Sequence, residues 1–208
     1  MSYIDALNWR YAVKQFSNEK LEPQQIEQIK EVVSLSASAY GMQPYKLLII
    51  ENESLKHDCV PFSYGQDKVE HCSHLLVFAN QTSISEQDIS HYISSLADAQ
   101  GISEQILLPY KNTISQDLLS RSQSEQAYWC EQQCYIALGN LLSFCAFNKI
   151  DACPMTGFDA TGINQVLGLN EQGLNAAIFC PVGYRSDDDI TSKRAKYRKS
   201  INQLVTTI

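Results

Sequence analysis

The segment that most constrains the fold is residues 123–148, which contains no proline. Apolar side chains recur through it at helical spacing, and this pattern predicts one long helix. Gly139 lies inside that helix and costs about 1 kcal/mol relative to alanine, so its presence suggests close approach by another helix. The residues that carry the pattern are Tyr128, Tyr135, Ile136, Leu138, Leu142, Phe144 and Cys145.

Shorter patterns predict the remaining elements. Pro23 suits a first helical position, and the apolar spacing after it predicts a helix over residues 23–35. Apolar runs at residues 45–50, 74–79 and 176–184 predict buried strands, and "QLVTTI" at the chain end predicts a last one. The polar stretch between the first two strands predicts an irregular turn region.

Residues 84–123 are rich in serine and glutamine and carry the weakest pattern, so we expect a lid or a variable insertion there. Helices and strands interleave along the whole chain without a composition boundary. The sequence therefore predicts a single α+β domain over residues 1–208.

Charge and cysteine content limit the partners and the compartment. The 208 residues are 44% hydrophobic, enough for a sizeable core, and 16 lysines and arginines against 23 acids give a net charge of −7. This balance disfavours nucleic acid and anionic membranes. Seven cysteines without a framework spacing predict buried free thiols in a reducing compartment. Because "MSYIDALNWRY" lacks signal-peptide character and residues 138–147 are too short to span a bilayer, we expect a soluble, cytoplasmic protein.

Several common sites are excluded by spacing. Cys130 and Cys134 lie one helical turn apart, but no second pair completes a metal site. The histidines show no zinc-protease spacing, so no metal centre is predicted. The chain also lacks GxGxxG and GxSxG motifs, which disfavours a dinucleotide-binding Rossmann unit and a serine hydrolase. The four histidines are His57, His71, His74 and His91.

Three local features remain. "RYAVKQF" places Arg10 and Lys14 four positions apart, which taken alone is most often a solvated helix face. "KRAKYRKS" forms a second basic cluster with Lys196 and Arg198, which alone is a basic surface turn. "DACPMTGFDA" could direct backbone N–H groups at a ligand around Gly157, or be a plain turn between a helix and a strand.

Together with "QPYKLLII", "SHLLVFA" and "PVGYRSDDD", these stretches occur in the order found in the nitroreductase family of FMN-dependent oxidoreductases, which nearly the whole chain resembles. The resemblance is greater to the oxygen-insensitive NAD(P)H nitroreductases and flavin reductases. It implies a mixed, mostly antiparallel sheet flanked by helices and an interlocked homodimer with FMN at the subunit interface. The long helix would supply much of the dimer surface.

The resemblance also assigns roles to residues. Arg10, Lys196 and Arg198 match the residues that bind the FMN phosphate, and Lys14 and Lys68 match lysines at the pyrimidine edge of the ring. A cation at that edge stabilises the reduced ring, which is anionic around N1 and O2. Tyr11 and Ala12 match residues that complete the N-terminal contact, the latter through its backbone. The remaining matches are Ser36, Ala37 and Ser38 in a loop that approaches the partner's flavin, and the backbone of Thr156 and Gly157 at flavin N5 and O4.

Four positions depart from the family pattern. Gly65 and Gly41 stand where relatives have asparagine, Ala12 where serine is common, and Thr156 where glutamate is common. The Gly65 change removes one polar contact to the ring unless Gln66 supplies it. At position 156 the contact is made by backbone N–H, so the change of side chain is tolerable.

The activity implied by the resemblance is a two-step exchange. NAD(P)H passes hydride to the flavin and leaves, and a nitroaromatic, a quinone or another electron-poor acceptor then takes two electrons in the same pocket. No side chain acts as a catalytic acid or base, because the flavin carries the chemistry. Two alternatives stay open: a flavin-binding module without turnover, and a flavin or enone reductase of the same family.

Overall fold

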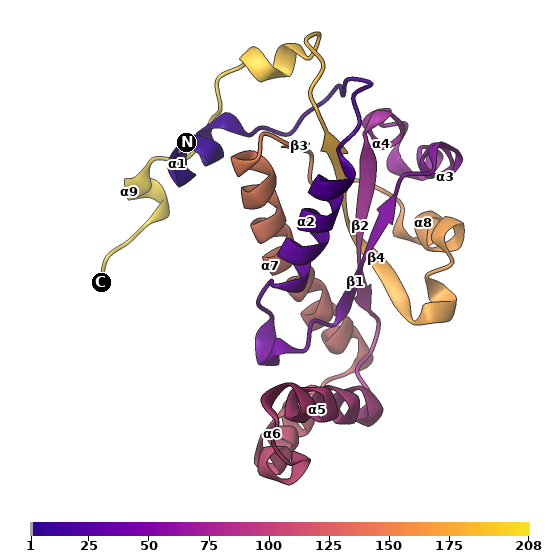
Figure 1. Ribbon diagram of the computed structural model, residues 1–208, viewed down its shortest axis with the longest axis vertical. Coiled ribbons are helices and arrows are strands. Elements are labelled where there is room, and N and C mark those ends of the chain that lie inside the picture. The colour runs from indigo at the N-terminus through magenta and orange to yellow at the C-terminus, as the bar shows by residue number, and fades with distance from the viewer. Residues whose placement is uncertain (1) are drawn as a thin grey trace.

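A four-stranded antiparallel sheet with the order β1-β2-β4-β3 organises the protein, whose computed structural model describes residues 2–208 (Figure 1). The strands are β1 (Tyr45–Ile50), β2 (His74–Gln81), β3 (Asp151–Ala152) and β4 (Leu174–Gly183). The three apolar runs predicted as strands are thus confirmed; β2 and β4 are buried almost throughout, whereas β1 is mostly half-buried, with Ile50 its one buried residue. The mixed helix and sheet architecture agrees with the predicted α+β fold.

Helices cover both faces of this sheet (Figure 1). Helices α2 (Pro23–Ser34) and α7 (Gln123–Phe147) lie on one face, and α3 (Glu53–Cys59), α4 (Lys68–His71) and α8 (Ala160–Leu167) lie on the other. Strand β2 serves both cores, since Leu76 and Phe78 join the core under α2 and α7 while Leu75 and Val77 join the opposite one. Burial on both faces explains why this strand reads as a continuous apolar run.

The two longest predicted helices are confirmed almost to the residue. Pro23 occupies the first turn of α2, where its missing N–H costs nothing. Helix α7 begins with a capping box in which Ser122 accepts from the backbone of Glu125 and Glu125 accepts from that of Ser122.

Residues 84–123 form a helical arm at the end of the molecule remote from α4 (Figure 1). Its helices α5 (Glu86–Gln100) and α6 (Leu108–Leu118) pack with the start of α7 around a separate small core. Each helix buries only a narrow apolar stripe, Ile89, Ile93 and Ala97 in α5 and Ile114 and Leu118 in α6. So few buried positions explain the weak sequence pattern.

Two sequence expectations are wrong. The stretch between β1 and β2 is not irregular, because Asn52 caps α3 and α4 follows it. The chain end is not a strand: Ser200 and Gln203 form a capping box that starts helix α9 (Ile201–Leu204), and residues 205–208 pair with no strand among residues 2–208. A terminal segment with no strand beside it gains nothing from an extended shape.

Gly139 is also not a site of close approach within the chain. A Cβ placed there would meet no atom within 4 Å among residues 2–208, outside its own helix backbone. The glycine lies on an exposed face of α7.

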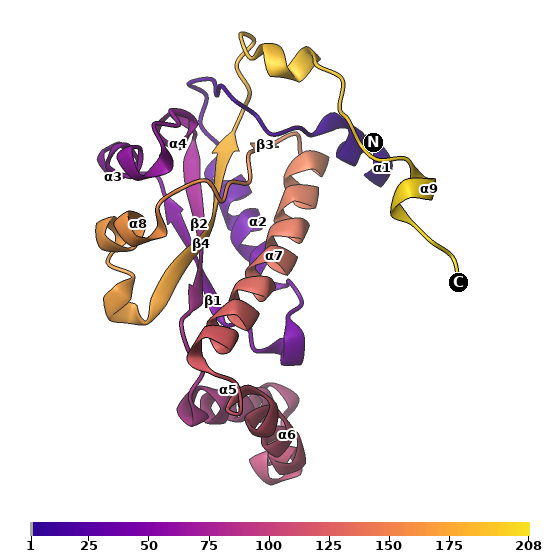
Figure 2. The ribbon, with the colours of Figure 1, turned by 180° about the vertical axis from the view of Figure 1, so that it is seen from behind.

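The remaining elements are short. Helix α1 (Tyr3–Trp9) packs on α7, and the chain end with α9 lies beyond α1, away from the sheet (Figure 2). Single 3-10 turns occupy Ala39–Gly41 (η1), Pro61–Ser63 (η2), Glu104–Leu107 (η3), Asn170–Gln172 (η4) and Ile190–Lys193 (η5). None of the helices formed by residues 2–208 combines the length and apolar character needed to cross a membrane.

All seven cysteines are free and buried, as the sequence predicted. Burial raises the pKa of Cys59 to about 11 and the pKa values of Cys72, Cys130, Cys134 and Cys145 to about 12. Burial also raises the pKa of Cys153, which lies near Lys68. These thiols are therefore protonated at neutral pH and poorly nucleophilic.

We expect the native protein to resist a thiol reagent such as DTNB at pH 8, since both access and thiolate formation are suppressed. After unfolding in guanidinium, all seven thiols should react. The absorbance of released thionitrobenzoate measures both numbers. One fast-reacting native thiol would contradict this expectation, and Cys153→Ser would show whether it is the one beside Lys68.

Candidate functional site

The antiparallel pairing of β2 with β4 brings Lys68 and the segment that follows β4 to one end of the sheet. His74, the first residue of β2, pairs with Val182 near the end of β4. Helix α4 with Lys68 therefore lies just before β2 at the same end where the segment after β4 leaves the sheet. Strand β3 also pairs with Val182 and Gly183, and this places the Thr156–Gly157 loop nearby.

The "RYAVKQF" segment is not a helix face. Helix α1 ends at Trp9, and Arg10 caps it in an extended conformation, with its N–H donating to the carbonyl of Ala6 (3.1 Å). Ala12 then forms a parallel bridge with Ala152. The extended path separates the side chains of Arg10 and Lys14, which a helix would place side by side, by up to about 13 Å along the backbone.

Arg10 belongs to a cation cluster with Lys196 and Arg198. The ammonium of Lys196 donates to the carbonyls of Leu7 (3.1 Å) and Asn8, which are exposed at the end of α1. Burial lowers the pKa of Lys196, and the nearby charges of Arg10 and Arg198 lower it further. None of these three cations pairs with a carboxylate in residues 2–208. A cluster of this kind favours an anion.

A third arginine supports this cluster but is itself neutralised. Arg185 donates to the buried carboxylate of Asp151 through Nη2 (2.6 Å) and Nε (3.0 Å). Its guanidinium also lies over the rings of Trp9 (4.2 Å) and Tyr11 (4.6 Å). These contacts fix the end of α1 and the start of the following segment.

Lys14 and Lys68 line a second site, a cavity of about 570 Å³ between the N-terminal segment and α4. Burial lowers the pKa of Lys68, and the charge of Lys14 adds to this effect. Two lysines close enough to repel one another mark a place for a negative ligand atom. The cavity is lined by Lys14, Gln15, Phe16, Asn18, Gln66, Asp67, Lys68, His71 and Ser186.

Gln66 joins this cavity to the Gly157 loop. Its Nε2 donates to the carbonyls of Gly157 and Ser63 (both 3.0 Å), and its Oε1 accepts from Lys68 Nζ (2.7 Å). The amide is thus fully occupied inside the protein. Gln66 acts as a brace between Lys68 and the loop, whereas Gly65 lies beside it with a left-handed φ of 67°.

The Thr156–Gly157 loop offers two backbone donors. It is held on one side by the bridge between Met155 and Phe179 and on the other by the stacking of Phe158 on Phe179 (4.4 Å). Thr156 and Gly157 themselves are exposed. Neither of their N–H groups has an acceptor within residues 2–208, so both are available to a ligand.

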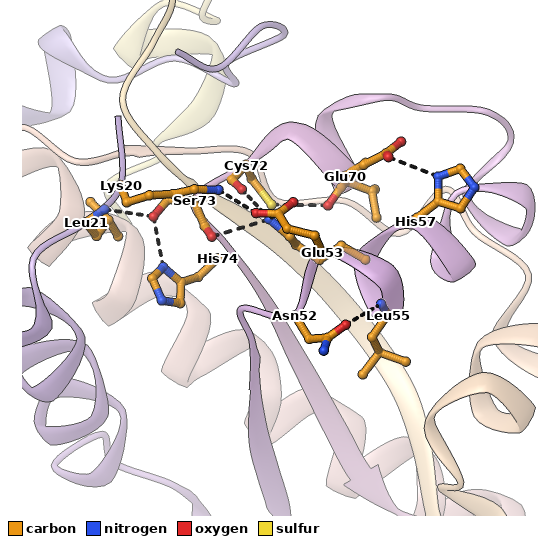
Figure 3. Close-up of polar contacts among 12 residues, drawn as sticks. Lys20, Leu21, Asn52, Glu53, Leu55, His57, Glu70, Cys72, Ser73 and His74 are labelled. Carbon is orange, nitrogen blue, oxygen red and sulfur yellow. Dashed lines mark hydrogen bonds and ion pairs between the residues drawn. The ribbon is translucent and has the colours of Figure 1, made fainter. Parts of the chain in front are cut away.

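Polar contacts behind the cavity hold the end of α4 (Figure 3). The fully buried Lys56 donates to the carbonyl of Cys72 (2.7 Å) and pairs with Glu53 (3.1 Å), which also binds Lys20 (2.7 Å). The hydroxyl of Ser73 accepts from the N–H of Leu21 (2.8 Å). The helix that carries Lys68 is therefore fixed at its C-terminal end.

The side chains of two predicted contact residues are already hydrogen-bonded within the protein. The Tyr11 hydroxyl donates to buried Asp189 (3.0 Å), so it does not face the cation cluster as a free donor. The Ser36 hydroxyl donates to Val32 (2.9 Å) and accepts from Asn140 (3.0 Å).

The structure does not bring residues 36–38 to the other site residues. They follow α2, whose 12 residues span about 18 Å, and they lie toward the α5–α6 arm (Figure 1). Tyr40, in the 3-10 turn η1 that follows Ser38, has a left-handed φ of 59°, and Tyr92 and Tyr110 of the arm donate to its carbonyl. A single chain thus holds the Ser36, Ala37 and Ser38 loop apart from Lys14 and Lys68.

Asp189 is the main residue of this region that sequence reasoning missed. Burial raises its pKa, but N–H donors from Lys14, Gln15 and Thr191 outweigh this and lower it to about 2. The only sequence signal is a run of three aspartates, which does not distinguish Asp189 from its exposed neighbours Asp187 and Asp188.

Known proteins resemble this chain over nearly its full length. The profile described as "Nitroreductase family" matches residues 7–184. The major NAD(P)H-flavin oxidoreductase of Aliivibrio fischeri is 27% identical over 99% of this chain and 98% of its own. A Haemophilus influenzae protein, provisionally named an NAD(P)H nitroreductase, is 30% identical over 89% of this chain and 86% of its own.

A crystal structure from Exiguobacterium sibiricum, in complex with FMN, has a similar fold. Its TM-score is 0.83 at 17% identity, and the match covers 100% of this chain and 98% of that one. At this identity the likeness concerns the fold alone.

Proposed function

Because the chain belongs to the nitroreductase family, we propose that it is an FMN-dependent NAD(P)H oxidoreductase that reduces nitroaromatics, quinones or related electron-poor acceptors. The observation that carries this proposal is the presence of two separate cation sites on one short extended segment. Arg10, with Lys196 and Arg198, lies at one end, and Lys14, with Lys68, lies at the other. FMN has the matching form, with a phosphate dianion and a ring joined by a ribityl chain.

The residues present fit this cofactor at both ends. The phosphate site contains cations that no carboxylate of residues 2–208 neutralises, and two arginines there can each grip phosphate oxygens with two donors. At the ring site, Lys14 and Lys68 would meet the pyrimidine edge, and the free N–H groups of Thr156 and Gly157 would meet polar ring atoms. The contact by Ala12 would come from its backbone.

When bound, FMN would supply the exchange of two electrons between NAD(P)H and the acceptor. The protein's share is to bind, orient and place charge. Gln66 would hold Lys68 and the Gly157 loop at a fixed separation. No side chain of the cavity is assigned as a catalytic acid or base.

Both substrates would use one pocket in turn. The sequence has no dinucleotide-binding loop, so NAD(P)H would lie on the flavin itself and leave before the acceptor enters. A reducing compartment such as the cytoplasm suits seven free thiols.

We propose that two chains assemble and complete each other's site. Helices α1 and α7 expose large apolar side chains, among them Ile4 (63%), Tyr135 (44%) and Ile136 (46%). Gly139 lies on the same exposed part of α7, where it would let a partner helix approach. The Ser36, Ala37 and Ser38 loop would then reach the flavin held mainly by the other chain, which accounts for its separation from Lys14.

The chain end supplies a further contact for such a dimer. Ile201, Leu204 and Val205 are each more than half exposed. A groove of about 500 Å³ beside the free edge of β1 is lined by Val33, Tyr45, Leu47 and Ile49 among others. We assign residues 201–208 of one chain to this groove of the other.

The competing function is a flavin-binding module without turnover, which would share every cofactor contact. Purified protein with a flavin absorbance spectrum would establish the cofactor. Oxidation of NADH or NADPH on addition of menadione or nitrofurazone would then separate an enzyme from a carrier. A flavin-loaded protein that oxidises neither nucleotide would overturn the enzymatic proposal.

Arg10→Ala should weaken FMN binding by about tenfold or more, because charge-assisted hydrogen bonds contribute roughly 1.5 to 3 kcal/mol each. Titration of the apoprotein with FMN, followed by flavin fluorescence, gives the dissociation constant. Arg194→Ala is the matched control, since Arg194 is exposed in the same basic stretch and has no assigned contact. Equal FMN affinity in both variants would remove Arg10 from the phosphate site.

Lys14→Ala should lower the reduction potential of bound FMN, because a missing cation disfavours the reduced, anionic ring more than the neutral oxidised ring. Lys68→Ala should act in the same direction. Equilibration with a reference dye measures the potential, with the exposed Lys46→Ala as control. If binding falls while the potential stays at the wild-type value, the lysine is a structural or phosphate partner only.

Truncation after Ser200 should loosen the dimer and release FMN together. The deletion removes the apolar chain end while keeping Lys196 and Arg198. Size-exclusion chromatography with flavin absorbance follows both properties at once. The full-length variant Leu204→Ser/Val205→Ser should show the same trend if apolar contact is the cause, and a truncated protein that stays dimeric and yellow would refute the link.

A further inference from the structure

Asp189 is the one buried member of the aspartate run that follows β4. Asp189 is only 2% exposed to solvent, whereas Asp187 and Asp188 are exposed. A buried carboxylate is unfavourable unless donors surround it. The structure supplies such donors from both terminal parts of the chain.

The two carboxylate oxygens serve different segments. Oδ2 accepts from the Tyr11 hydroxyl (3.0 Å) and from the N–H groups of Lys14 (2.7 Å) and Gln15 (3.2 Å). Oδ1 accepts from the N–H of Thr191 (2.9 Å) and so caps the 3-10 turn η5. One side chain therefore holds the segment with Arg10 and Lys14 and also starts the segment that leads to Lys196.

Further backbone contacts join the same two segments around this carboxylate. The N–H of Ser186 donates to the carbonyl of Gln15 (2.9 Å), and Phe16 forms an antiparallel β-bridge with Arg185. Beyond η5, Lys196 donates to the carbonyls of Leu7 and Asn8 in the last turn of α1, which ends just before Arg10. The segment with Arg10 and the segment with Lys196 and Arg198 are thus tied to each other, and Asp189 lies between them.

We propose that Asp189 is a positioning residue that presets the two cation sites before the cofactor enters. The proposal rests on the function proposed above. The carboxylate of Asp189 accepts from the backbone N–H of Lys14 and not from its ammonium group. It therefore acts on the path of the chain and not on the charged group that would meet the ligand. It orders the segments on which Arg10, Lys14 and Lys196 are carried. Tyr11 takes part as a donor to Asp189 and not as a direct ligand.

Asparagine cannot reproduce this arrangement, because a carboxamide has one acceptor oxygen and a donor in place of the other. In one orientation of Asp189→Asn the amide oxygen keeps the bonds from Tyr11, Lys14 and Gln15, and the NH2 group faces the N–H of Thr191 without a bond. In the other orientation the oxygen keeps the Thr191 bond, and the NH2 group faces the remaining donors. The substitution also removes a buried negative charge beside Lys14. Asp188→Asn makes the same chemical change at an exposed neighbour and is the matched control.

Three measurements test the proposal. In the apoprotein, Asp189→Asn should speed hydrogen exchange of the Lys14 or Thr191 amide at least tenfold. It should weaken FMN at least tenfold. In the loaded protein it should raise the flavin potential, opposite in sign to Lys14→Ala, because a negative charge has been lost. Because that rise follows from the charge change alone, the positioning role is read from amide exchange and FMN affinity, and Tyr11→Phe, which keeps the charge, is the companion variant.

The outcomes separate the two proposals. Wild-type protein that binds no FMN overturns the proposed function, while faster amide exchange in Asp189→Asn would still support the ordering role. Wild-type exchange and FMN affinity in Asp189→Asn would overturn the positioning role. If circular dichroism shows that this variant does not fold, Tyr11→Phe carries the test. It keeps the charge, and it should weaken FMN several-fold with an unchanged potential, whereas wild-type affinity would overturn the proposal.

Discussion

The pairing of β2 with β4 is the interaction on which the rest of the structure depends. It lies at the centre of the sheet, is buried on both faces, and sets the register in which His74 meets Val182. Because this register is fixed, α4 before β2 and the aspartate run after β4 emerge at one end of the sheet. The candidate site is thus assembled by strand pairing between segments about a hundred residues apart in sequence.

At that end the protein keeps several cations close together, which costs electrostatic free energy until an anion arrives. The structure offsets this cost while neutralising Arg185 alone among the clustered cations of residues 2–208. Arg185 is paired with Asp151, Lys196 donates to helix carbonyls, and Asp189 takes backbone donors. Carboxylates therefore stabilise the framework, while Arg10 and Arg198 stay free of carboxylate partners within residues 2–208. An anion site needs this division, since a carboxylate beside the cations would compete with the ligand.

Much of the fold could be predicted because its signals are local. The apolar β1 run and the helical spacing in α2 and α7 each lie within a short stretch of sequence, and the structure confirms these three elements. The short helices α3 and α4 were not predicted, because seven and four residues are too few to show a helical period. At the site, Arg10, Lys14 and Lys68 could be matched by family resemblance, and their role in binding stays a prediction. The commitment of Tyr11 to Asp189 joins residues 178 apart, and no local pattern reports such a contact.

The Ser36, Ala37 and Ser38 loop is held apart from Lys14 of its own chain by rigid structure. Helix α2 is rigid and about 18 Å long, and tyrosines of the α5–α6 arm hold Tyr40 beyond its end, so the loop cannot swing to its own chain's cavity without breaking these contacts. If the loop contacts flavin at all, it must contact one bound to another chain. The arm, predicted from the sequence as a lid or a variable insertion, would then support the partner's site. Cofactor binding and assembly would be linked equilibria, each favouring the other, because each chain would supply a wall that the other lacks.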